Sequence, residues 1–265
     1  EPLRITADGV ALIGHGTIVQ TNPRAHIIEI SGAKNVRIES LTLRRRHHDQ
    51  RMRHDGVRCN DCTNVTLDRL RIYDNKSQGA AIRLADCRDA TIDSCLIVNY
   101  KTIGVDDRTR NPLQGYAFRC IDGNGIAAQN SIGTVIRDNR IVEHDVLPTE
   151  AMQQRHRLGT LTDGSEPSQL GDLGRRAVRN DYTPHWHQGS AIVVSGPIVT
   201  RHAQIIGNYI ENAAQGVDMH CDQTLCSNNV VRSAKIGLKA THGSRNLVLD
   251  GNLLSGVDLW GIVLN

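Results

Sequence analysis

Residues 180–191, NDYTPHWHQGSA, concentrate ring side chains that can act as acids and bases. The segment contains Tyr182, His185 and His187, although the 265-residue chain has only two Trp, five Tyr and one Phe. His185 and His187 are two positions apart, so on an extended chain their side chains point the same way. Because His and Tyr are common proton carriers in catalysis, the segment is predicted to contribute to a catalytic site.

A sequence repeat determines which other side chains share this site. Its period is roughly 20 to 25 residues, which is typical of solenoids. One half is an x-Gly step with alternating residues, as in residues 55–61 (DGVRCND), and the other half is a strand, a polar turn and a strand, as in residues 64–72 (NVTLDRLRI). Helical periodicity and hairpin turns are not evident. The repeat therefore predicts an all-β, single-domain parallel β-helix over residues 1–265, in which the GHG of residues 14–16 is a turn.

Alternation along the strands predicts two columns of outward side chains. Counting from each repeated Gly, the first and third residues are apolar and are predicted to point inward, so the second and fourth face solvent. The second-position column is Arg58, Ala81, Ala127, Ala191, Asp218, Lys239 and Val263. The fourth-position column is Asn60, Arg83, Gln129, Val193, His220, Thr241 and Asn265.

These columns predict a groove with a flat floor of three alanines. Arg58 and Arg83 lie at one end, and Asp218, His220 and Lys239 lie at the other with His242 just beyond. The ends are three coils apart, or about 14 Å at the usual strand spacing, which is the length of a short oligosaccharide. The alternative is an ordinary solvated sheet face on which Asp218 and Lys239 form a surface ion pair.

Two insertions, at about residues 100–123 and 144–187, interrupt the repeat. Each leads directly into an x-Gly strand, so both are predicted to hang over the start of the same face and to wall the groove. The second contains a predicted short helix at TEAMQQRHRL. It ends at Tyr182, His185 and His187, and this placement brings them to the end of the groove that holds Asp218 and Lys239.

The predicted side chains suit β-elimination on a uronic-acid polymer. A cation must neutralise the sugar carboxylate, a base must remove the C5 proton, and an acid must protonate the leaving oxygen. Tyr182, His187, His220 and Lys239 are the candidate catalytic residues. The predicted substrate-binding residues are Arg58, Arg83, Gln129, His185, Asp218 and His242.

Other chemistries fit these residues less well. His185, His187 and His220 could hold a transition metal, but we expect no cofactor, and no acidic cluster suits Ca²⁺. Glycoside hydrolysis requires two carboxylates, whereas Asp218 stands alone on the predicted face. A C5-epimerase, which shares the proton abstraction, and a non-catalytic glycan-binding β-helix remain alternatives.

Composition narrows the classes further. The net charge of +3 is too small for a nucleic-acid-binding tail. The basic runs at residues 44–48 (RRRHH) and 51–54 (RMRH) are either a solvated loop or a landing strip for a polyanion. No apolar stretch approaches the length of a membrane span. Most of the seven cysteines are interpreted as small apolar fillers of a buried ladder.

Residues 215–220 (QGVDMH), 237–246 (GLKATHGSRN) and 258–262 (DLWGI) resemble secreted bacterial proteins of the pectate-lyase superfamily. The similarity is strongest to β-helical alginate lyases such as those of polysaccharide lyase family 31. It covers roughly residue 180 to the end. The resemblance implies a right-handed parallel β-helix and a metal-independent lyase that uses Lys239 and Tyr182. It also implies an anionic polysaccharide as partner and a secreted or periplasmic location. TPH at 183–185 only partly matches the Asp-Pro-His motif of mannuronan epimerases.

Overall fold

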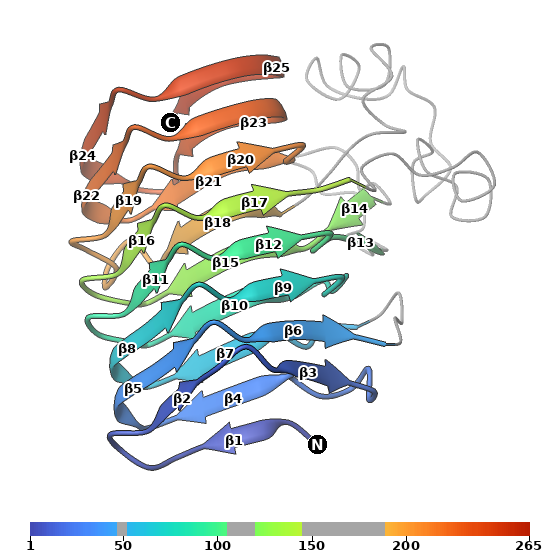
Figure 1. Ribbon diagram of the computed structural model, residues 1–265. Helices are drawn as coiled ribbons and strands as arrows, with labels where there is room; N and C mark the ends of the chain where they lie inside the picture. The colour runs from blue at the N-terminus through green and yellow to red at the C-terminus, as the bar shows by residue number, and fades with distance from the viewer. Residues whose placement is uncertain (47–51, 105–119, 145–188) are drawn as a thin grey trace, which may run out of the picture.

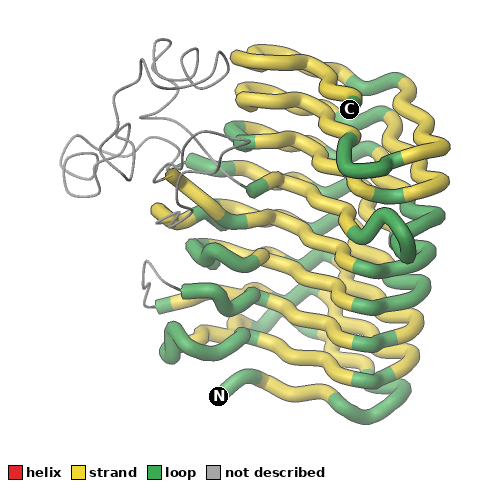
Figure 2. Tube along the Cα trace, turned by 180° about the vertical axis from the view of Figure 1, so that it is seen from behind, coloured by secondary structure: helices red, strands yellow, loops and turns green. Residues whose placement is uncertain are grey.

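The chain forms a stack of coils that rises steadily from the N-terminus to the C-terminus (Figure 1). The structure is a computed structural model, and it describes residues 1–46, 52–104, 120–144 and 189–265. Short parallel strands form the walls of the stack and loops form its corners (Figure 2). The predicted parallel β-helix is therefore confirmed. Among the described residues, no helix is long and apolar enough to cross a membrane.

Each complete coil contributes strands to three faces. The first face carries the candidate site and consists of β1 (Leu3–Ile5), β4 (Ile28–Ser31), β7 (Val57–Asn60), β10 (Ala80–Ala85), β15 (Asn124–Gln129), β18 (Ser190–Ser195), β21 (Gln215–His220) and the second halves of β23 (Val230–Ala240) and β25 (Leu253–Leu264).

The other two faces close the coil. The second face is an eight-stranded sheet of β2 (Ala11–Ile13), β5 (Lys34–Glu39), β8 (Thr63–Asp68), β11 (Thr91–Asp93), β16 (Val135–Arg137), β19 (Gln204–Ile206), β22 (Asp222–Ser227) and β24 (Arg245–Asp250). The third face consists of β3 (Thr17–Gln20), β6 (Thr42–Arg45), β9 (Arg71–Tyr73), β12 (Leu96–Val98), β17 (Arg140–Val142), β20 (Tyr209–Glu211) and the first halves of β23 and β25. The GHG at 14–16 is the predicted turn, between β2 and β3.

One strand pair departs from the parallel pattern. β13 (Thr102–Gly104) and β14 (Cys120–Asp122) pair antiparallel at the two ends of the first predicted insertion. The pair is an exception to the parallel pattern that the repeat predicts, although, as expected, no hairpin turn joins its two strands. The sequence lacks the signal because no short turn joins the two strands. The remainder of the insertion lies outside the described residues.

Stacked aliphatic side chains fill the interior, as the alternation predicts. On the first face, Val57, Ile82 and Ile126 lie side by side in register and are fully buried. Burial of this apolar surface is the main stabilising contribution, at about 25 cal/mol per Å². The six cysteines whose side chains are described are free and buried, which confirms their role as small core residues.

Tight corners between the strands depend on residues that accept a positive φ. Asn35, Asn64 and Asp89 take this conformation at successive corners, where Asn and Asp are favoured over other residues with a Cβ. The repeated Gly answers a different requirement. At Gly216, a Cβ would lie 2.5 Å from the carbonyl oxygen of Gly237 in the next coil. The coils are thus held too close at this position for a side chain.

A ladder of buried asparagines ties four coils together at one corner. Asn139 donates from Nδ2 to Asn208 Oδ1 (2.9 Å), Asn208 Nδ2 donates to Asn229 Oδ1 (2.9 Å), and Asn229 Nδ2 donates to Asn252 Oδ1 (2.9 Å). Each of the first three also donates to a backbone carbonyl. Buried amides are therefore satisfied in register, and slippage of one coil past the next would break the whole set.

Candidate functional site

Strand pairing on the first face places the two arginines, the aspartate and the lysine in a single outward column. In register, this column reads Glu29, Arg58, Arg83, Ala127, Val193, Asp218, Lys239 and Val263. The neighbouring outward column reads Ser31, Asn60, Ala85, Gln129, Ser195 and His220. Arg83 and Asp218 are three strand steps apart, or about 14 Å.

The predicted floor of three alanines is wrong at two of its members. Ala81 and Ala191 are fully buried and occupy the place that the repeated Gly takes in neighbouring coils. In these two coils, Gly79 and Gly189 lie two residues earlier, so counting from them shifted the register by two. A shift of two preserves which residues point outward, but it moves Arg83 and Val193 into the wrong column.

Asp218 connects the two candidate catalytic residues that the structure describes. Its Oδ2 lies 3.2 Å from Lys239 Nζ, and its Oδ1 lies 2.8 Å from His220 Nε2. Lys239 Nζ also donates to Gln215 Oε1 at 3.4 Å. Asp218 is buried beneath the partially exposed side chains of Lys239 and His220. The pair with Lys239 is therefore not the weak, fully solvated ion pair of the alternative interpretation.

The contacts of His220 indicate which ring nitrogen carries the proton. Nε2 lies against the Asp218 carboxylate and 3.3 Å from Thr241 Oγ1. An ionised carboxylate only accepts hydrogen bonds, so Nε2 carries the proton and Nδ1 of a neutral ring keeps its lone pair. The exposed His242 stacks beside this ring, with centroids 4.6 Å apart. His220 is thus arranged as a base, with Lys239 beside it as a cation.

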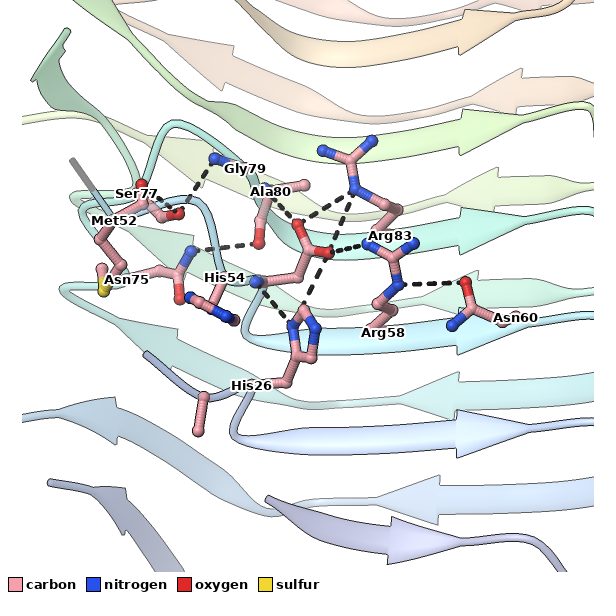
Figure 3. Close-up of polar contacts among 12 residues, drawn as sticks. His26, Met52, His54, Arg58, Asn60, Asn75, Ser77, Gly79, Ala80 and Arg83 are labelled. Carbon is pink, nitrogen blue, oxygen red and sulfur yellow. Dashed lines mark hydrogen bonds and ion pairs between the residues drawn. The ribbon is translucent and has the colours of Figure 1, made fainter. Parts of the chain in front are cut away.

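A second polar cluster surrounds Asp55, which the sequence analysis missed (Figure 3). Asp55 is fully buried at the corner before β7, and it accepts the backbone N–H of Ala80 at 2.7 Å. Arg83 Nε lies 3.1 Å from both carboxylate oxygens, and Arg58 Nη1 lies 3.2 Å from Oδ2. Arg58 Nε donates in addition to Asn60 Oδ1. The two predicted binding arginines are therefore held side by side by one carboxylate.

The partly buried His26 and the buried Arg45 also contact Asp55. His26 Nδ1 accepts the backbone N–H of Asp55 at 2.9 Å, and burial, only partly offset by the Asp55 charge, lowers the pKa of the ring. Arg45 donates to Asn75 Oδ1 and to the backbone carbonyl of Asp55. Burial lowers the pKa of Arg45 to about 10. This residue is therefore not part of a solvated loop or a landing strip, because alternation along β6 turns it inward.

A signal for Asp55 is present in the sequence. Among the residues that precede the repeated Gly, it is the only charged one. The others are Gln78, Asn124, Gln188, Gln215, Ile236 and Trp260. Asp55 is a carboxylate at a position that is uncharged in the other repeats, so a cationic partner was to be expected. Arg58, three residues later, is the nearest candidate.

The remaining predicted site residues divide into two groups. Gln129 is exposed in the outward column next to Arg83's, so its predicted placement on the face is confirmed. Tyr182, His185 and His187 lie outside the described residues, as do most of both insertions and the predicted helix, and their roles stay predictions. The described ranges contain no group of three His, Cys, Asp or Glu side chains arranged for a metal.

The first face carries a second carboxylate besides Asp218. Asp218 is not alone on the face, because Glu29 occupies the same column at the opposite end. Five strand steps separate the two, or about 24 Å, whereas glycosidase carboxylates lie roughly 5 to 9.5 Å apart. Within the described part of the face, no second carboxylate shares the column near Asp218.

Solved structures with a similar course of the chain include three proteins. An alginate lyase from Paenibacillus sp. str. FPU-7 is 15% identical with a TM-score of 0.46, covering 99% of this chain and 91% of its own. The catalytic domain of a GH87 α-1,3-glucanase is 12% identical with a TM-score of 0.43, covering 97% of this chain, which in turn spans only 51% of the glucanase chain. The Streptococcus pneumoniae adhesin PfbA is 10% identical with a TM-score of 0.43, covering 98% of this chain and 68% of its own. At these scores, the likenesses carry no argument about activity.

Sequence comparison gives the family itself. No curated protein matches the chain. The family model described as the right handed beta helix region matches residues 5–150, which is more than half of the chain. The match runs through the coils that carry Asp55, Arg58 and Arg83, and the structure continues the same coil pattern to β25. The chain therefore belongs to the right-handed β-helix family.

Proposed function

We propose that the chain is an enzyme that acts on an acidic polysaccharide and cleaves a polyuronate such as alginate by β-elimination. The contact chain from Lys239 through Asp218 to His220 carries the proposal. It places the cation Lys239 and the base His220 on one carboxylate. Both lie on a face that is long enough for several sugars. The arginines in the same column suit a polymer with repeated negative charges.

In the proposed reaction, each side chain has a defined task. Lys239 has three N–H donors and uses two on Asp218 and Gln215, so a third is available to neutralise the uronate carboxylate. His220 Nδ1 takes the C5 proton. The electron pair of the C5–H bond forms the C4–C5 double bond as the C4–O bond breaks, and an acid protonates the leaving oxygen. Tyr182 and His187, which are predicted to be catalytic, are the candidates for this acid, and His185 is predicted to bind substrate.

Asp218 supports this chemistry without touching the substrate. It fixes the His220 tautomer and holds Lys239 within the same site, as a carboxylate commonly does for a catalytic imidazole. Its removal leaves Lys239 and His220 without their common partner. The proposed mechanism requires no metal. Activity is expected to survive EDTA treatment, and loss that is restored by adding back a divalent cation would contradict this.

The test is incubation of the wild-type protein with alginate, pectate and glycosaminoglycans while the ultraviolet absorbance of the unsaturated product is followed. A rise on at least one polyuronate is expected. NMR of the products separates the alternatives. A changed uronate ratio without cleavage indicates C5-epimerisation, and binding without any chemical change indicates a glycan-binding protein. Either outcome would contradict the lyase proposal.

The location is proposed on the same basis. A polymeric substrate lies outside the cell that degrades it, so we place the protein in the periplasm or the medium of a bacterium. Fractionation of the native source with an antibody against the protein tests this, and recovery from the cytosol alone would contradict it.

A further inference from the structure

We propose that Arg83, held by the buried Asp55 together with Arg58, forms a separate carboxylate-binding subsite on the first face. This inference rests on the proposed function, since it assigns to a distant acidic sugar of the same substrate a binding site of its own. Asp55 is a positioning residue in this subsite. It does not contact the substrate, and it sets the direction in which the two guanidinium groups face.

The contacts of Arg83 leave its most useful edge free. Arg83 is bound to Asp55 only through Nε, at 3.1 Å from each oxygen. Nη1 and Nη2 have no partner among the residues that the structure describes, and they point away from the carboxylate contact (Figure 3). Two parallel N–H donors in a rigid plane match the two oxygens of a carboxylate.

Charge explains why an anion is the fitting ligand. Arg58 and Arg83 are adjacent in register on neighbouring strands, and one carboxylate lies between them. Two guanidinium groups against Asp55 leave a net charge of +1 (2 − 1) at the subsite, and the next carboxylate in the column, Glu29, is paired with Arg4. Asp55 is fully buried, whereas both arginines are partially exposed. The positive charge is therefore presented to solvent and the negative charge is not.

The neighbouring column positions provide room for a bound chain. Between Arg83 and Asp218, the column contains only Ala127 and Val193, which have no charge to compete for the substrate. The subsite is three strand steps, or about 14 Å, from the carboxylate that carries Lys239 and His220. A sugar chain lying along the column would thus meet a second cationic site beyond the reacting unit, and polymers with carboxylates on successive sugars would be favoured over neutral ones.

The subsite is tested by measuring a binding constant. The result therefore does not depend on whether the protein catalyses the proposed reaction. Hexasaccharides of mannuronate, guluronate and galacturonate are titrated by calorimetry into the Lys239→Met protein, which prevents their consumption. At least one is expected to bind, and Arg83→Gln in this background is expected to raise its Kd by about tenfold to a hundredfold. Arg83→Lys should weaken binding similarly, because a lysine keeps the charge but not the planar pair of donors. Arg137→Gln is the matched control, since Arg137 also pairs with an aspartate but lies on the second face.

Asp55→Asn separates positioning from simple charge attraction. The variant makes the subsite more positive, so attraction alone would tighten binding, whereas loss of positioning weakens it. The methyl-esterified hexasaccharide should bind every variant equally. A general loss of structure would weaken both ligands, so weakening of the acidic hexasaccharide alone identifies the subsite. If Asp55→Asn does not fold, the two Arg83 variants carry the test.

The contrary results are equally specific. The subsite is refuted if no acidic hexasaccharide binds the Lys239→Met protein, or if Arg83→Gln binds with an unchanged Kd. Equal weakening by Arg137→Gln, or tighter binding by Asp55→Asn, would also contradict it. Failure of the proposed function has a different signature, because wild-type protein would then leave polyuronates uncleaved while the dependence of binding on Arg83 persisted.

Discussion

At the scale of single residues, two buried carboxylates determine what the first face presents to solvent. Asp218 joins Lys239 and His220, and Asp55 joins Arg58 and Arg83. Isolated buried carboxylates are costly, and their partners offset that cost. In both clusters, the carboxylate is buried and its basic partners are partially exposed. The face therefore offers positive groups to an anionic ligand although its carboxylates nearly balance them.

The partly buried ring of His26 predicts a pH dependence of stability. Burial lowers its pKa below the ordinary value of 6.5, so the unfolded chain binds a proton at a higher pH than the folded protein does. Stability from the neutral ring is then fully present above pH 6.5 and is lost as the pH falls towards the lowered pKa. We expect His26→Asn to flatten this loss in chemical denaturation measured from neutral to mildly acidic pH. Parallel curves for the variant and the wild type would contradict the assignment.

At the scale of strands and corners, the sequence predicts the elements well and their alignment less well. Alternation in segments such as 64–72 indicated which side chains point inward, because one residue in two must be apolar. Alignment between coils was inferred from the repeated Gly, and it failed where Ala81 and Ala191 take that place. Alanine at a position that usually excludes a Cβ cannot be foreseen from one sequence. The Lys239, Asp218 and His220 cluster was predicted correctly because Gly216 and Gly237 are in register.

The asparagine ladder predicts a stability effect far from the candidate site. Asn208→Ala removes hydrogen bonds to Asn139, Asn229 and a backbone carbonyl, and leaves buried partners unsatisfied. We expect a loss of about 1 to 3 kcal/mol in the free energy of unfolding, measured by denaturant titration. Gln204→Ala, at an exposed position of β19 on the second face, is the control and should change stability little. A loss of similar size in both would remove the ladder's special role.

At the scale of the whole molecule, the stacked coils bury the six cysteines whose side chains are described in one continuous interior. Burial raises the pKa of Cys95 and Cys226 to about 12, whereas a hydrogen bond from Cys87 lowers the pKa of Cys62 to about 7. Because the thiolate is the reactive form, we expect the native protein to be alkylated slowly and Cys62 to be modified before Cys95 and Cys226. Mass spectrometry of peptides after timed alkylation gives the order. Early labelling of Cys95 or Cys226 would contradict it.

Contacts between residues of different coils are the part of the site that the sequence could not predict. The repeat indicated the solenoid because each coil has the same short-range pattern, and a family match over residues 5–150 agrees with it. The Asp55 cluster depends on Arg45, His26 and Arg83, which come from different coils and lie up to 57 residues apart (83 − 26). No local pattern connects such residues. Tyr182, His185 and His187 lie outside the described residues, so their part in the site rests on the sequence alone.

Lys239 and His220, joined by Asp218, are proposed to perform β-elimination on a polyuronate. The most direct measurement is the initial rate of ultraviolet absorbance increase for Lys239→Met, His220→Gln and Asp218→Asn, with Lys34→Met and His15→Gln as exposed controls and melting temperatures recorded for all. The expected result is a loss of about a hundredfold or more in each site variant that folds, with both controls close to wild type. Wild-type rates in Lys239→Met and His220→Gln would show that the reaction does not occur at this site.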